Sequence, residues 1–166
     1  MVILGLDPGS RFTGFGVVRR AGNALSRIDA GRLSVPTKIG TAQRLAWLGQ
    51  QVGELLLRYE PDAVAIETTF AGVNNRSLIV MAQARGAILS ALGATELEPR
   101  EFSPAEIKRT VAGNGRAGKE QVARMVGMLL GIDAAGLSAD ATDALAVALC
   151  CAQNVTMDEI RRRVRR

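Results

Sequence analysis

The order of hydrophobic patterns along the chain constrains its fold more than any other feature. Three strand-like stretches come first and suggest an antiparallel meander, and a long segment with helical spacing of leucines follows them. Strand-like and helix-like segments then alternate. This order predicts an α/β protein with a mixed sheet and helices on its faces. Strands are expected over residues 2–7, 12–20, 24–35, 62–67 and within 95–102, and helices over 40–60, 76–93, 103–113, 118–131 and 140–153.

The length of 166 residues suits one domain with a sizeable core. We expect this domain to span residues 1–155, and the basic segment 156–166, which ends in RRRVRR, to be a flexible tail. Gln83 and Arg85 interrupt the longest apolar run, and no basic region precedes the first one, so neither a membrane span nor a secretory signal is expected. These features predict a cytoplasmic protein.

The chain contains no histidine, and its two cysteines, Cys150 and Cys151, are adjacent within a helical pattern. This composition excludes Ser-His-Asp triads and histidine-ligated nucleases, and it argues against a zinc site or a disulfide framework. The formal net charge of +5 favours a polyanionic partner. An enzyme of this composition has to use carboxylates, lysines, hydroxyls or a bound ion.

Four acidic residues stand at the ends of expected elements. Asp7 closes the first strand, Glu67 closes the fourth, and Asp140 and Asp143 open the last helix. Each has an ordinary structural alternative, because Asp7 could begin a turn, Glu67 could be solvated, and helix capping could explain one acid of the last pair. If the first and fourth strands are neighbours, all four carboxylates converge, and their repulsion predicts two neutralising divalent cations. Ligation by oxygen alone favours Mg²⁺ or Mn²⁺ over zinc or copper.

A glycine-rich segment between two expected helices is flanked by two lysines, Lys108 and Lys119. The glycines of RTVAGNGRAGK, at positions 113, 115 and 118, would let backbone N–H groups approach a phosphate. The same pattern is typical of a flexible connection with ordinary surface lysines. The residues alone leave both interpretations open.

Several motifs, taken in order, resemble the RuvC family of Holliday-junction resolvases. The resemblance runs from ILGLDPGSRFTGFGVV through AIETTF, AQARGAIL and IKRTVAGNGRAGKEQVARMV to SADATDALAVAL, and it covers residues 2 to about 153 without a large gap. The segment IETTFAGVNNRS departs from the family's commoner acid and aromatic residues. The order of elements also matches the ribonuclease H-like fold, so a mixed five-stranded sheet with helices on both faces is expected.

The resemblance implies a structure-selective endonuclease of DNA recombination and repair. Such an enzyme nicks two strands of a four-way junction symmetrically as a homodimer, and RuvA and RuvB are its implied branch-migration partners. In two-metal hydrolysis, one ion lowers the pKa of the attacking water and the other stabilises the leaving 3′ oxygen. Asp7 is the expected bridging ligand of the two Mg²⁺ or Mn²⁺ ions, with Glu67, Asp140 and Asp143 as the other ligands.

The resemblance also implies contacts with DNA. It places Lys119 near the scissile phosphate, where its charge would stabilise developing negative charge, and it favours Lys108 and Arg116 as phosphate anchors. Phe70 would stack on an unpaired base near the crossover, although an aromatic residue there is also typical of a core. The expected DNA-binding residues are Phe70, Asn74, Arg76, Lys108, Arg116 and Lys119.

Small residues recur every four positions in the second expected helix, at Ala82, Gly86 and Ser90. They would let another element approach closely, which is commonly packing against the sheet. The resemblance instead places the dimer contact on this helix.

Two other functions remain open on the sequence. DPGSRFTG also resembles the phosphate-binding turn of actin-like and sugar-kinase-like nucleotide-binding proteins, although those usually hold the nucleotide between two domains. A catalytically silent junction-binding module is the second alternative, and the four acids argue against it. Activity on a junction distinguishes these functions.

Overall fold

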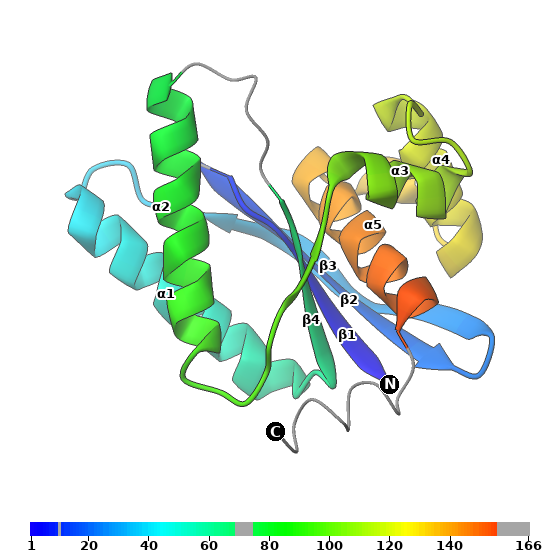
Figure 1. Ribbon diagram of the computed structural model, residues 1–166, viewed down its shortest axis with the longest axis horizontal. Helices are drawn as coiled ribbons and strands as arrows, with labels where there is room; N and C mark the ends of the chain where they lie inside the picture. The colour runs from blue at the N-terminus through cyan, green and yellow to red at the C-terminus, as the bar shows by residue number, and fades with distance from the viewer. Residues whose placement is uncertain (10, 69–74, 156–166) are drawn as a thin grey trace.

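The computed structural model describes residues 1–9, 11–68 and 75–155, which form a sheet with helices on both faces (Figure 1). The sheet has five strands in the order β3-β2-β1-β4-β5. β1 (Val2–Asp7), β2 (Phe12–Ala21) and β3 (Ala24–Ser34) form the expected antiparallel meander. β4 (Ala63–Glu67) pairs parallel to β1, and β5 (Arg100–Phe102) pairs parallel to β4. The first and fourth strands are therefore neighbours, which is the condition for the four acids to converge.

Helices cover both faces of the sheet. α1 (Thr41–Tyr59) and α2 (Asn75–Leu92) lie together on one face, and α3 (Pro104–Ala112), α4 (Lys119–Leu130) and α5 (Ala139–Asn154) lie on the other (Figure 1). The predicted mixed five-stranded architecture is confirmed. Within the described ranges, no helix has the length and hydropathy that crossing a membrane requires.

Two local features differ from the expectations. β5 occupies only the end of the segment 95–102, because Pro99 has no N–H for a strand ladder and the Thr95 N–H donates to the Leu92 carbonyl at the end of α2. A short 3-10 helix, η1 (Ala134–Gly136), was not expected, and the Asp133 side chain caps it by accepting from the Ala135 N–H.

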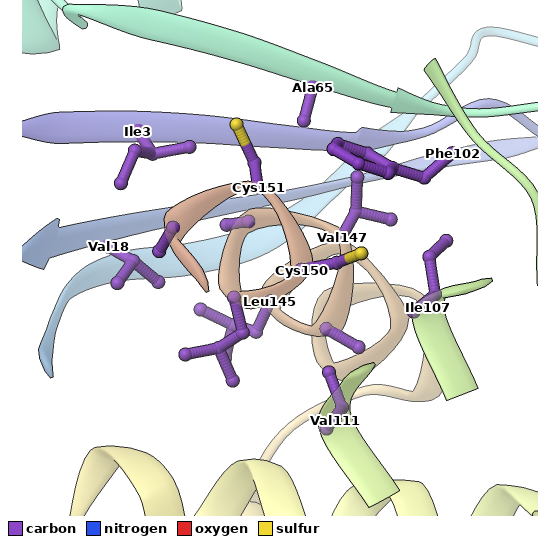
Figure 2. Packing of buried hydrophobic residues seen from close by; sticks show 14 of the residues in the cluster. Ile3, Val18, Ala65, Phe102, Ile107, Val111, Leu145, Val147, Cys150 and Cys151 are labelled. Carbon is purple, nitrogen blue, oxygen red and sulfur yellow. The ribbon is translucent and has the colours of Figure 1, made fainter. Parts of the chain in front are cut away.

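The alternation of side chains along the strands divides the core between the two faces. On β1, Leu4 and Leu6 pack with residues of α1 and α2, whereas Ile3 packs with α5. Cys150 and Cys151 on α5 are fully buried in this second cluster (Figure 2), as expected for small hydrophobic residues. α5 is therefore a core helix whose charged residues, Asp140 and Asp143, lie in its first turns.

α5 lies directly on the sheet because glycines leave room for its backbone. A Cβ atom added at Gly5 of β1 would lie 2.3 Å from the Ala144 carbonyl oxygen. One added at Gly14 of β2 would lie 2.0 Å from the Asp140 carbonyl oxygen. No side chain fits in either position. These glycines therefore allow the start of α5 to pack closely against the end of the strand that carries Asp7.

Candidate active site

The strand period brings Asp7 and Glu67 to the same face of the sheet. Asp7 lies two residues after Gly5, which faces α5. Glu67 lies two residues after Ala65, which belongs to the hydrophobic cluster around α5. Leu6 pairs with Ile66 in the parallel β1–β4 ladder, so the two acids end neighbouring strands side by side. The predicted convergence of these two carboxylates is consistent with this register.

α5 supplies the other two acids, and its capping does not use them. The Ser138 side chain caps the helix by accepting from the Ala141 N–H. Asp140 and Asp143 are thus released from the structural role that could have explained one of them. Because residues three apart share one helix face, both carboxylates can turn towards the strand ends.

A pocket of about 210 Å³ joins three of the acids to two cations. Asp7, Glu67 and Asp143 line it together with Lys108 and Lys119. Asp140 is not among its lining residues, although its charge acts on Asp7. The apolar wall consists of Pro104, Ile107, Val122 and Ala146, which belong to no chemical motif in the sequence.

The charges of the carboxylates act on one another's pKa values. Burial raises the pKa of Asp7 to about 7, and the charges of Glu67, Asp143 and Asp140 contribute in that order, whereas Lys119 opposes them. Burial also raises the pKa of Glu67, with a further contribution from Asp143. Neighbouring negative charges therefore disfavour full ionisation of this site when no cation is bound.

Lys108 and Lys119 reach the pocket from two different helices. Ser103 and Glu106 form a capping box at the start of α3, and Pro104 occupies the first turn. This start turns Ile107 into the core and Lys108 into the pocket. Lys119 begins α4, and its Nζ lies 3.5 Å from Asp143 Oδ2 while the side chain remains 82% exposed.

Arg32 is a cation near the acids that sequence reasoning missed. Its Nη1 lies 4.0 Å from Asp140 Oδ2, across the junction between β3 and α5. The contact joins residues more than a hundred positions apart. Only the register of the β2–β3 hairpin, combined with the packing of α5, could have indicated it.

The donor set suits a hard divalent cation, although it is not gathered into a closed cage. Among the described residues, no three potential ligands are assembled closely enough to hold an ion. Arg32 faces Asp140 and Lys119 faces Asp143. Oxygen-only donors and the raised pKa of Asp7 nevertheless fit Mg²⁺ or Mn²⁺, and Mg²⁺ commonly keeps several waters.

The remaining predicted DNA contacts lie outside the pocket or outside the described residues. Arg116 is exposed in the α3–α4 loop, where its N–H donates to Asn114 Oδ1 and the Ala117 N–H donates to the Asn114 carbonyl. These bonds show an ordered turn in the predicted glycine-rich connection. Arg76 belongs to the first turn of α2, and Phe70 and Asn74 lie outside the described residues.

Comparisons with known proteins agree with this geometry. The family described as crossover junction endodeoxyribonuclease RuvC matches residues 3–151. The chain is 41% identical to the protein of that name from Alkaliphilus metalliredigens over 154 residues, which cover 93% of this chain and 94% of the relative. It is 39% identical to the one from Geobacter metallireducens over 165 residues, covering 99% and 100%.

Solved structures show the same similarity. Thermus thermophilus RuvC in complex with a Holliday junction substrate superposes with a TM-score of 0.85 at 32% identity, covering 92% of this chain and 93% of that one. The yeast mitochondrial Holliday junction resolvase Ydc2 has a TM-score of 0.67 at 10% identity, covering 98% and 80%, which indicates a shared fold.

Proposed function

Because the chain belongs to the RuvC family of crossover junction endodeoxyribonucleases, we propose that its acidic pocket is the site that resolves four-way DNA junctions. The family acts in DNA recombination and repair, and its members are metal-dependent nucleases. The proposal is carried by one observation: Asp7 lies close enough to Glu67, Asp140 and Asp143 for their charges to raise its pKa, in a pocket that two lysines also line. The nucleotide-binding alternative is not favoured by these relatives.

The four carboxylates would hold two Mg²⁺ or Mn²⁺ ions, with Asp7 as the central ligand. Bound at this site, such ions would supply an activated water and would stabilise the leaving 3′ oxygen. Asp7 is suited to the central position because all three other acids act on its pKa. The apolar wall around Ile107 and Val122 limits the water that can surround the reacting phosphate.

The lysines of the pocket would act on the phosphate itself. Lys119 is mostly exposed, and its ammonium group lies near the Asp143 carboxylate. It stands at the N-terminal, positive end of α4, where the helix dipole does not stabilise a lysine. We assign it to stabilising the charge that develops during cleavage. Lys108 and Arg116 would anchor neighbouring phosphates, and Phe70, Asn74 and Arg76 would contact the strands near the crossover.

The two cuts require two sites, and α2 offers a surface for a homodimer. Ala84 and Ile88 face the core, whereas Ala82, Gly86 and Ser90 are exposed on the other side of the helix. Among the described atoms, none of a neighbouring element lies within 4 Å of a Cβ added at Gly86. The alternative that this stripe packs against the sheet does not hold for these exposed residues. A two-fold contact here would present two pockets to two equivalent strands. RuvA and RuvB are proposed partners, and the cytoplasm is the proposed location.

A junction-cleavage assay tests the function. A synthetic four-way junction and a matched duplex are each incubated with and without Mg²⁺ or Mn²⁺. We expect metal-dependent cleavage of the junction alone, and a loss of several orders of magnitude in Asp7→Asn with junction binding retained, because the variant loses a ligand and also a repulsive charge.

The matched control is Asp133→Asn, which removes an aspartate outside the pocket. It should cleave normally. Cleavage by Asp7→Asn at the wild-type rate would disprove the shared-site proposal, and junction binding without cleavage by the wild-type protein would make it a silent binding module.

A further inference from the structure

We propose that Arg32 is a phosphate-binding residue on the sheet side of the acidic site, and that Asp140 and Phe12 hold its guanidinium in place until DNA and metal arrive. This inference rests on the proposed function, because it assigns a further contact to the same DNA. Lys108 and Lys119 approach the acids from α3 and α4, whereas Arg32 approaches Asp140 from β3. The site would then have cations on two sides.

The hairpin register places Arg32 beside Asp140. Arg32 of β3 pairs with Gly14 of β2, and directly paired residues project to the same face of a sheet. Gly14 has no side chain, and the backbone of Asp140 occupies the space where its Cβ would be. The first turn of α5 therefore fills the gap next to Arg32, and the Asp140 carboxylate lies at the guanidinium.

Phe12 fixes the orientation of this guanidinium. Phe12 pairs with Ser34, so it is the diagonal neighbour of Arg32 on the same face. The Arg32 Cζ atom lies 4.3 Å from the centroid of the Phe12 ring, which is 37% exposed. Stacking of this kind uses the face of the guanidinium and leaves the N–H groups at its edge available, as planar recognition of phosphate requires.

The ion pair between Arg32 and Asp140 is weak enough to be exchanged. The atoms are 4.0 Å apart, and the side chains of Arg32 and Asp140 are 47% and 32% exposed. Exposed ion pairs contribute little to stability because water screens them. A divalent cation at Asp140 would compete directly with Arg32, and a DNA phosphate would compete with Asp140 for the guanidinium.

This exchange predicts two effects of opposite sign for Arg32→Ala. Junction affinity, measured by fluorescence anisotropy in EDTA so that no strand is cut, should fall about 3- to 10-fold. The slope of log affinity against log salt should decrease by about 1, as expected for one lost phosphate contact. Mn²⁺ affinity of the DNA-free protein, measured by calorimetry, should instead increase, because a competing positive charge is gone.

Two further variants separate charge from structure. Arg27→Ala is the matched control, because Arg27 is exposed on the same strand but pairs with Val18, away from the acids. It should change neither affinity. Arg32→Lys keeps the charge without the planar stacking on Phe12, so its junction affinity should lie between those of the wild-type protein and Arg32→Ala.

The outcomes distinguish this inference from the function on which it rests. Unchanged junction affinity in Arg32→Ala, or weaker Mn²⁺ binding, would overturn the assignment while leaving the proposed function intact. Equal losses in Arg27→Ala and Arg32→Ala would also overturn it, because they would reflect net charge alone. Failure of the wild-type protein to prefer the junction over duplex would contradict the proposed function and the inference together.

Discussion

At the scale of single residues, the pKa of Asp7 reflects the electrostatics of the site most directly. Its pKa of about 7 in the folded chain lies above the value of 3.8 expected when it is solvated. Between these values the folded protein binds more protons than the unfolded chain, so stability falls as pH rises through this interval. Below pH 4 the effect of Asp7 is fully stabilising, and it is lost as pH rises through about 7.

This sign predicts how the metal-free protein melts. In EDTA at pH 8, Asp7→Asn should unfold at a higher temperature than the wild-type protein, and the difference should shrink towards pH 5. A tenfold change in proton affinity is worth about 1.4 kcal/mol, so the gain reaches a few kcal/mol at most. Calorimetry with Glu96→Gln, an exposed acid away from the pocket, provides the control. A melting temperature of Asp7→Asn that is lower at pH 8 would show that burial and the neighbouring charges do not disfavour the ionised form of Asp7.

Lys119 and Arg116 carry the same charge but differ in position, so their replacement by alanine should have different effects on cleavage and binding. Lys119 lines the pocket, whereas Arg116 is exposed in the adjoining loop. We expect Lys119→Ala to slow single-turnover cleavage by ~10²-fold or more with a small effect on binding, because its charge acts on the transition state. Arg116→Ala should mainly weaken binding and reduce its salt dependence. Equal losses in rate and affinity for Lys119→Ala would make it an anchor instead.

At the scale of elements, α5 is the platform of the site. Its helical pattern was clear from the sequence, and the helix extends over Ala139–Asn154 against an expected 140–153. Periodicity could not predict how closely the α5 backbone approaches the sheet. This close approach depends on Gly5 and Gly14, which lie opposite that backbone. The meeting of Arg32 with Asp140 follows from that close approach, and for this reason the pair escaped prediction.

α2 carries the proposed dimer contact on its exposed face. Gly86→Leu should weaken self-association by at least about tenfold, since a bulky side chain would separate two closely packed helices. Circular dichroism should remain that of the folded domain, because the added side chain meets open space in the monomer. Sedimentation equilibrium measures the change. Gly53→Leu on α1, another helical glycine with open space, is the matched control, and an unaffected dimer in Gly86→Leu would place the contact elsewhere.

At the scale of the whole molecule, element order carried most of the predictable information. The meander and the two helical layers follow from patterns that are local in sequence. The adjacency of β1 and β4 joins segments far apart in the chain, so the sequence could offer it only as a condition. The placement of Asp7, Glu67 and Asp143 around one pocket then followed from topology. Ion pairs across the sheet and the apolar wall around Ile107 depend on tertiary packing, and Phe70 and Asn74 remain predictions because they lie outside the described residues.

The central claim is that two acidic pockets, brought together by a dimer, cut a four-way junction in a paired manner. A supercoiled plasmid that extrudes a cruciform tests this most directly, because it becomes linear within one binding event only when both strands are nicked before the protein dissociates. With Mg²⁺ and limiting protein, we predict linear plasmid as the main first product, and neither product from Asp7→Asn. Accumulation of singly nicked circles as the main product of the wild-type protein would contradict the claim.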